Sequence, residues 1–221
     1  MASPARSIAT LLFDWDGTLV DSALLGLAAF RKTFAELGIE FSDEIYEAAY
    51  SPNWYSIYQA LGLPQPQWQR ADSLWMKHYG LQPAEPVRHA KETISELHQR
   101  GYCLGVVSSG TESRVLREIE HAGLSGKFQV VVCNEHIVQK KPHPEGLEIA
   151  LQKLGCAKDE CGYVGDAPED IEMGKRAKVL TIGVKSSYPT SVRLMAADPD
   201  IYIGSVEQLL DHFPALLANR E

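Results

Sequence analysis

The sequence of 221 residues has no long apolar run and few cysteines. No uninterrupted apolar stretch approaches the roughly 18 residues that a membrane-spanning helix needs, so we expect no membrane partner. The apolar stretch near the N-terminus is too short for the central region of a signal peptide. The four cysteines form no Cys-x-x-Cys pair, which argues against a zinc site and indicates free thiols in a reducing compartment. We therefore predict a cytoplasmic protein.

Positive charge is also scarce, with 21 Lys and Arg against 29 Asp and Glu and a formal net charge of −8. A nucleic-acid partner requires basic surface, so this balance argues against one. It does not argue against a small phosphate ester, because a local lysine and a metal ion can hold such a group. No two of the histidines have a metal-binding spacing such as His-x-x-x-His, and we expect each to be a surface or core residue.

The stretch Leu11–Asp21, LLFDWDGTLVD, joins a short apolar strand to two aspartates. Burial of an unpaired charge is costly, so Asp14 and Asp16 need a positive partner, and their oxygen atoms suit Mg²⁺. Residues i and i+2 of an extended chain point to the same side, so both carboxylates can face one pocket beyond the strand end. Gly17 permits a sharp turn there. An ordinary turn that closes a strand would use the same residue types.

Strands and helices alternate along most of the chain. The predicted strands are Ile8–Asp14, Cys103–Val107, Phe128–Cys133, Cys161–Val164, Val179–Val184 and Ile201–Ile203. The predicted helices are Leu27–Leu37, Val87–Arg100, Thr111–Ala122, Glu145–Leu154, Pro168–Ala177 and Val206–Phe213. This alternation predicts an α/β fold, a doubly wound parallel sheet of the Rossmann-like kind. In such sheets ligands bind beyond the carboxyl ends of the strands.

An all-helical block interrupts the alternation. We expect short helices at Asp43–Tyr50, Trp54–Leu61 and Pro66–Tyr79 and no convincing strand from Gly38 to about Pro86. The sequence thus predicts a core domain of residues 1–20 and 87–221, with an inserted all-helical cap domain of residues 21–86. Its aromatic residues Trp54, Tyr55 and Tyr58 either form the core of the cap or contact a substrate, and the first reading is favoured.

Further polar groups follow other predicted strands. Ser108, Ser109 and Gly110 offer a hydroxyl and backbone N–H groups at a strand-to-helix turn, which suits an anion. An ordinary helix cap would use the same residues. Lys141 lies in a loop, in the run Lys-Lys-Pro-His-Pro, where most lysines are only solvated. We expect its neighbour His143 to be a loop residue.

Two more aspartates stand between a predicted strand and a predicted helix. The dipole of a helix favours acidic residues in its first turn, which accounts for Glu169 and Asp170. It accounts less well for Asp166, because a carboxylate at a strand end that points inward needs a positive partner.

Taken in order, these residues resemble the four signatures of the haloacid dehalogenase-like superfamily. The first is Asp14-x-Asp16-Gly-Thr, followed by Ser108, Lys141 and Gly165-Asp166 with Asp170. The chain looks most similar to the branch of phosphoglycolate phosphatase and β-phosphoglucomutase, with a helical cap. The resemblance implies a Mg²⁺-dependent phosphatase that hydrolyses a small phosphorylated metabolite, a phosphomonoester, through an aspartyl-phosphate.

The resemblance also implies a role for each residue. Asp14 is the nucleophile, and Mg²⁺ is held by Asp14, the backbone carbonyl of Asp16 and Asp166, with Asp170 as a brace behind them. Ser108 and Lys141 hold the phosphate; Ser109 belongs to the same cradle, although the role of its side chain is open. Asp16 is the general acid and base, and we expect burial under the cap to raise its pKa toward neutrality against the opposing effect of the metal.

Three alternatives use the same fold. A dehalogenase is disfavoured because it has no need of an acid at Asp16. A phosphomutase would share all the core residues and stays open. A non-catalytic phosphate-binding module would be expected to lose one of Asp14, Asp16, Lys141 or Asp166, and none is missing. The sequence determines neither the natural substrate nor the oligomeric state.

Overall fold

The computed structural model describes residues 8–216, and its centre is a six-stranded parallel sheet. The strand order is β5-β4-β1-β6-β7-β8, with β1 between β4 and β6. The strands are β1 (Thr10–Phe13), β4 (Cys103–Val107), β5 (Val130–Val132), β6 (Cys161–Gly165), β7 (Leu180–Val184) and β8 (Ile201–Ile203). Thr10 pairs with both Cys103 and Cys161, so the three central strands end at the same level.

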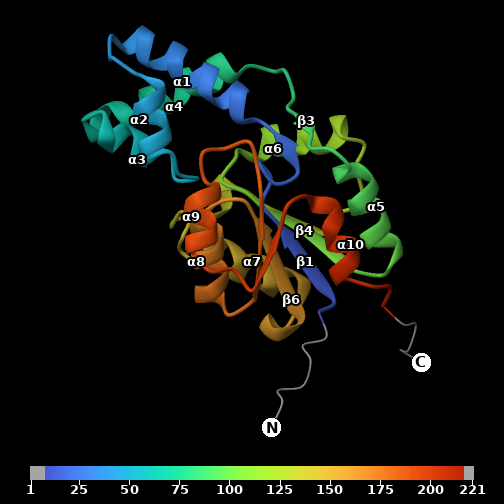
Figure 1. The fold of residues 1–221 in the computed structure, drawn as a ribbon. Coiled ribbons are helices and arrows are strands. Elements are labelled where there is room, and N and C mark those ends of the chain that lie inside the picture. The colour runs from blue at the N-terminus through green and yellow to red at the C-terminus, as the bar shows by residue number, and fades with distance from the viewer. Residues whose placement is uncertain (1–7, 217–221) are drawn as a thin grey trace.

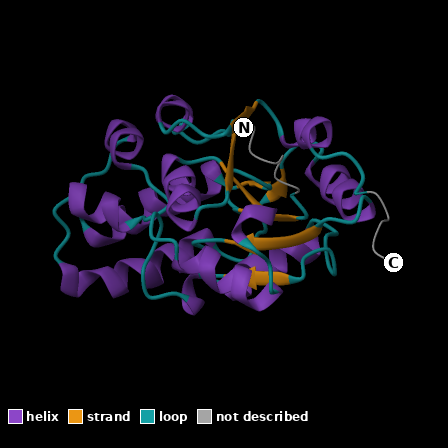
Figure 2. Ribbon diagram, turned by 90° about the horizontal axis from the view of Figure 1, so that it is seen from below, coloured by secondary structure: helices purple, strands orange, loops and turns teal. Residues whose placement is uncertain are grey.

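Helices cover both faces of this sheet, as Figure 2 shows. They are α5 (Ala90–Gln99), α6 (Glu112–His121), α7 (Glu145–Leu154), α8 (Pro168–Ala177), α9 (Ser191–Ala196) and α10 (Leu209–His212). Side chains alternate along β1: Leu11 and Phe13 pack in the same hydrophobic cluster as Ile94 of α5, whereas Leu12 packs in another with Leu147 of α7. The predicted doubly wound α/β fold is confirmed.

Four helices form a separate cap at one end of the molecule, shown in blue and teal in Figure 1. They are α1 (Ala23–Leu37), α2 (Asp43–Ala49), α3 (Tyr55–Ala60) and α4 (Trp68–Tyr79). The cap has its own hydrophobic core, in which Phe34, Ile57 and Tyr58 are fully buried. The helical cap is therefore confirmed, while its limits at residues 21 and 86 stay a prediction.

The connection between cap and core contains the two shortest strands. β2 (Val20–Asp21) runs antiparallel to β3 (Glu85–Pro86), so the chain enters and leaves the cap side by side. The expectation of no strand between Gly38 and about Pro86 missed β3, and β2 was not predicted either, because two residues carry no readable periodicity. Helix α5 begins at Ala90 and not at Val87, since His89 adopts a left-handed conformation (φ 63°) just before it.

Smaller elements also escaped the sequence analysis. Helix α9 was not predicted, and the last predicted helix is a 3₁₀ turn followed by the single turn of α10. The 3₁₀ helices are Gln65–Gln67, Asn134–His136, Lys158–Glu160 and Val206–Gln208. All four cysteines are free. Among residues 8–216 no helix combines the length and apolar character that crossing a membrane demands.

Candidate active site

The carboxyl ends of the three central strands bring the predicted residues together. Asp14 directly follows β1, Ser108 follows β4 and Asp166 follows β6. Because β1 lies between the other two strands, residues far apart in sequence become neighbours at one edge. Lys141, from the loop that precedes α7, and Asp170, in the first turn of α8, complete the group.

Lys141 links two of these carboxylates. Its ammonium nitrogen lies 2.6 Å from Asp14 Oδ1 and 2.7 Å from Asp170 Oδ1, and all three side chains are buried. Asp170 also accepts hydrogen bonds from the Tyr163 hydroxyl at 3.2 Å and the Ala167 N–H at 3.0 Å. Burial lowers the pKa of Lys141, but the charges of Asp14 and Asp170 outweigh it and hold that pKa well above its ordinary value. Asp170 therefore fixes the position of a lysine that stays protonated.

Asp14, Asp166 and Asp170 form a buried acidic cluster in which one oxygen from each lies within 4.8 Å of the others. Burial raises the pKa of Asp14 to about 7, although the Lys141 ammonium acts against it. Burial, and then the charges of Asp14 and Asp170, raise the pKa of Asp166 well above its ordinary value. Asp166 accepts a hydrogen bond from Ser186 Oγ at 2.6 Å and forms no ion pair within the described residues.

These donors fit a hard divalent cation. All of them are oxygen atoms, and Asp166 is a buried carboxylate without a cationic partner in residues 8–216. Gly17 (φ 79°) leaves room for the Asp166 carboxylate, since a Cβ at position 17 would lie only 2.4 Å from Asp166 Oδ2. The oxygens of Asp170 are engaged with Lys141, Tyr163 and Ala167. Asp14 and Asp166 are thus the side chains suited to Mg²⁺.

Asp16 lies beside this cluster but has a different partner. Arg114 of α6 grips its carboxylate with two nitrogens, Nη1 to Oδ1 at 2.9 Å and Nη2 to Oδ2 at 2.6 Å. Ser22 Oγ donates a further hydrogen bond of 2.6 Å. Burial raises the pKa of Asp16, but Arg114 and Ser22 outweigh it and hold the pKa below its ordinary value. The expected rise in this pKa is therefore wrong for this arrangement, because a guanidinium faces the carboxylate.

Arg114 belongs to a buried network that sequence reasoning missed. Its Nη1 also lies 3.0 Å from Glu118 Oε2, and Glu118 is fully buried. Glu118 accepts hydrogen bonds from Trp15 Nε1 at 2.7 Å and from the Tyr79 hydroxyl at 3.0 Å. Tyr79 ends the last cap helix, so the network joins the catalytic edge to the cap. In sequence, Arg114 and Glu118 look like an ordinary exposed pair four residues apart on a helix.

The serine loop differs from a simple helix cap. Ser108 is buried, and its Oγ accepts a hydrogen bond from the Gly110 N–H at 2.9 Å. The cap residue of α6 is Thr111, whose side chain forms no capping hydrogen bond. Ser109 and Gly110 line the cavity described below, whereas Ser108 supports the loop behind them. The phosphate-binding roles of Ser108 and Ser109 stay predictions.

The lysine loop separates its two lysines. Lys141 points into the acidic cluster, while Lys140 donates to Asn134 Oδ1 and lies 4.3 Å from the centre of the Trp54 ring in the cap. His143 Nδ1 accepts a hydrogen bond from the Glu145 N–H at 3.2 Å, as expected of a loop residue.

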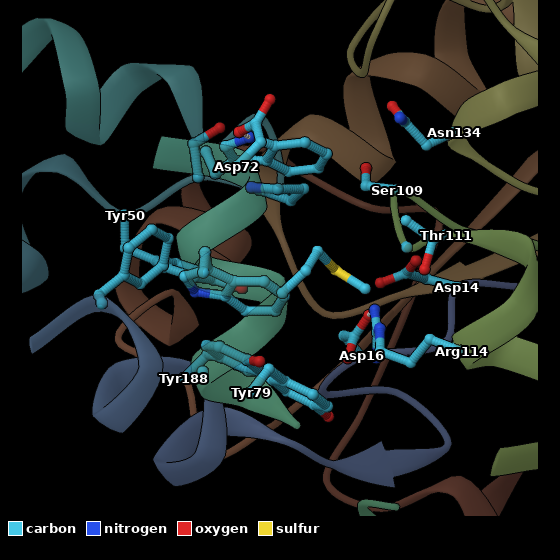
Figure 3. A pocket seen from close by; sticks show the side chains of 18 of the residues that line it. Asp14, Asp16, Tyr50, Asp72, Tyr79, Ser109, Thr111, Arg114, Asn134 and Tyr188 are labelled. Carbon is cyan, nitrogen blue, oxygen red and sulfur yellow. Dashed lines mark hydrogen bonds and ion pairs between the residues drawn. The ribbon is translucent and has the colours of Figure 1, made fainter. Parts of the chain in front are cut away.

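A cavity of about 180 Å³ lies between the catalytic edge and the cap. Figure 3 shows Asp14, Asp16 and Arg114 on one side of it and Tyr50, Tyr79 and Tyr188 on the other. Of the three aromatic residues singled out from the sequence, Trp54 and Tyr58 line the cavity, and all three pack in the core of the cap. Packing in the core of the cap, the favoured interpretation, thus applies to all three residues, and Trp54 and Tyr58 are also placed where they could contact a substrate.

Comparisons with known proteins agree with this arrangement. The family model described as haloacid dehalogenase-like hydrolase matches residues 11–184. Pyrophosphatase PpaX from Oceanobacillus iheyensis is 31% identical over 207 residues, which cover 92% of this chain and 96% of the relative.

Solved structures show the same fold. A haloacid dehalogenase-like family hydrolase from Streptococcus pneumoniae superposes with a TM-score of 0.83 at 22% identity, covering 95% of this chain and 100% of that one. The β-phosphoglucomutase of Clostridium difficile superposes with a TM-score of 0.74 at 19% identity, covering 91% and 93%. These structures show the fold alone, whereas the family model and the PpaX relative confirm the predicted superfamily: the chain belongs to the haloacid dehalogenase-like hydrolase family as a phosphatase.

Proposed function

We propose that the chain is a Mg²⁺-dependent phosphatase that hydrolyses a small phosphomonoester through a phosphoenzyme on Asp14. The observation that carries the proposal is the buried group formed by Asp14, Lys141 and Asp166 at the end of the central strand. A carboxylate oxygen of Asp14 attacks phosphorus, the bond from phosphorus to the alcohol oxygen breaks, and an aspartyl-phosphate forms. Water then attacks this intermediate and regenerates Asp14.

The other residues of the site support this transfer by position and charge. Lys141, held by Asp170, supplies positive charge beside the nucleophile and the phosphoryl oxygens. Asp14, Asp166 and the backbone carbonyl of Asp16 would hold Mg²⁺, which would supply positive charge to neutralise the phosphoryl group. Asp16 serves the leaving oxygen and then the water as acid and base, and this role requires its contact with Arg114 to loosen during the cycle.

The name of the PpaX relatives makes pyrophosphate a candidate substrate, and phosphomutase activity remains the alternative chemistry of the same core. Product analysis separates them, since a mutase returns the phosphoryl group to a sugar and releases no inorganic phosphate in net.

The test is Asp14→Asn against an exposed control, Asp159→Asn. Phosphate release from p-nitrophenyl phosphate with Mg²⁺ should fall to background in the first variant and stay at the wild-type rate in the second. Circular dichroism checks that both are folded. Appreciable Mg²⁺-dependent turnover by a folded Asp14→Asn variant would refute the proposed nucleophile.

A further inference from the structure

The cavity has two chemically different ends. Its catalytic end contains Asp14, Asp16 and Asp166, which the proposed function assigns to the phosphoryl group and the metal. Its far end is built from the cap and must receive the leaving group. Tyr79 and Tyr188 border both ends, since Arg114 Cζ lies 5.1 Å from the centre of the Tyr79 ring and the Tyr188 ring lies beside Gly17. The residues of the far end therefore indicate the chemical nature of the leaving group, which is the part of the substrate that differs from one phosphatase to another.

Aromatic rings dominate the far end. Two pairs are stacked: Tyr50 on Tyr188 with ring centres 4.6 Å apart, and Trp75 on Tyr79 at 4.9 Å. The aromatic lining residues are Phe30, Tyr46, Tyr50, Trp54, Tyr58, Trp75, Tyr79 and Tyr188. Flat apolar walls of this kind favour a leaving group that is itself a ring over a compact hydrated anion.

The far end offers no unpaired positive charge among the described lining residues. Asp72 of α4 accepts hydrogen bonds from Trp54 Nε1 at 2.8 Å and from the Tyr58 hydroxyl at 2.9 Å. The Lys140 ammonium lies 4.3 Å from the centre of the Trp54 ring. Arg114 is the cation among the described lining residues, and it is paired with Asp16 and Glu118. A second phosphate or a carboxylate would thus find Asp72 and no unpaired cation in the described lining.

Four buried polar atoms of the lining form no hydrogen bond with the described residues. They are the Tyr46 hydroxyl, Trp75 Nε1, Thr111 Oγ1 and Arg114 Nε. Tyr46 is only 5% exposed. Buried polar groups are normally paired, so these atoms point to a ligand that brings polar atoms of its own. Hydroxyl or ether oxygens on a ring would meet this requirement without adding charge.

We propose that the leaving group of the substrate is an uncharged alcohol that carries a single ring. This inference rests on the proposed function and names the substrate class of the same site. The size of the cavity sets an upper limit, since its volume of about 180 Å³ holds the phosphoryl group as well as the leaving group, and an engineered cavity of about 150 Å³ admits one benzene. The leaving group is therefore no larger than a single ring, whereas pyrophosphate would leave the aromatic walls without a partner.

The test compares four phosphate compounds with the wild-type protein and Mg²⁺: benzyl phosphate, ethyl phosphate, phosphoglycolate and pyrophosphate. Benzyl and ethyl phosphate both release simple alkoxides, so their comparison isolates the contribution of the ring. We expect kcat/KM for benzyl phosphate to exceed that for ethyl phosphate by about tenfold to a hundredfold. Pyrophosphate has the better leaving group, so a preference for benzyl phosphate cannot come from intrinsic reactivity.

A change of charge provides a second measurement. Met76 lines the far end one helical turn after Asp72, and Met76→Lys would place a cation there. The ratio of kcat/KM for phosphoglycolate to that for benzyl phosphate should rise at least tenfold. The control is the same substitution at Met195, an exposed residue of α9 outside the lining, and it should leave this ratio unchanged.

The outcomes are distinct. Turnover of pyrophosphate or phosphoglycolate by the wild-type protein at a kcat/KM equal to or above that of benzyl phosphate would overturn the inference and leave the phosphatase proposal standing. No turnover of any of the four, or of p-nitrophenyl phosphate, would overturn both.

Discussion

The buried contacts of Arg114 lead to a specific prediction for stability. Only 4% of the Arg114 side chain is exposed, and its guanidinium joins Asp16 and Glu118. Arg114→Gln would leave two carboxylates without their cation, one of them fully buried. Removing one partner of a buried ion pair costs about 3–5 kcal/mol, because the remaining charge stays desolvated. For a chain of this size that loss corresponds to a fall in melting temperature of about 6–20 °C.

A matched control exists on the surface. Arg31 also contacts both oxygens of an aspartate, Asp43, but the two side chains are 52% and 55% exposed. An exposed pair contributes at most about 1 kcal/mol, so Arg31→Gln should lower the melting temperature by less than about 4 °C. Thermal unfolding followed by circular dichroism, with and without Mg²⁺, measures both variants.

The network also predicts non-additivity. Glu118→Gln alone leaves Arg114 with Asp16 as its acidic partner, and the double variant removes both charges of the inner pair. The double variant should be more stable than the sum of the single losses predicts, by roughly 0.5–3 kcal/mol. The reasoning is wrong if Arg114→Gln melts no lower than Arg31→Gln, or if the two network substitutions are additive.

Three other substitutions test the rest of the molecule. Mg²⁺ should raise the melting temperature of the wild-type protein, and Asp166→Asn should remove most of that rise; an equal rise in the variant would exclude Asp166 as a ligand. Gly17→Ala should abolish phosphatase activity in a folded protein, since its Cβ would lie 2.4 Å from Asp166 Oδ2, and normal kcat/KM would contradict this. Trp54→Phe should cost about 1–3 kcal/mol of stability through the lost hydrogen bond to Asp72, and urea unfolding would show whether it does.

The strand-end residues were predictable because simple rules apply to them. Residues 10–13 are all buried, as the apolar run indicates, and the chain after a buried parallel strand emerges at the ligand-binding edge. The same rule places Ser108 and Asp166 on the two strands next to β1. The prediction that Lys141 belongs to the site depended on the family resemblance as well, since no periodicity indicates where the side chain of a loop lysine lies.

The electrostatic surroundings of these residues were not predictable in the same way. Sequence reasoning weighed burial and a metal for Asp16, and burial does raise its pKa. The sign of the pKa shift depends on a third group, Arg114, which is 98 residues away in the chain and reaches Asp16 only through the packing of α6 in the hydrophobic cluster on one face of the sheet. A helix pattern gives no indication that one of its charged residues faces inward toward another charge.

The cap presents the same difficulty at the other end of the cavity. Asp72 reads in sequence as one of the polar residues of an amphipathic helix, yet the indole and phenol groups of α3 and its N-terminal flank converge on it. Which face of α4 meets α3, and which meets the catalytic edge, is decided by the packing of four short helices, and no local signal specifies it. The motif residues shared across the family act on the phosphoryl group and do not indicate which alcohol leaves from the substrate. The side chains that distinguish one substrate from another are therefore those of the cavity wall, whose positions follow from tertiary packing alone.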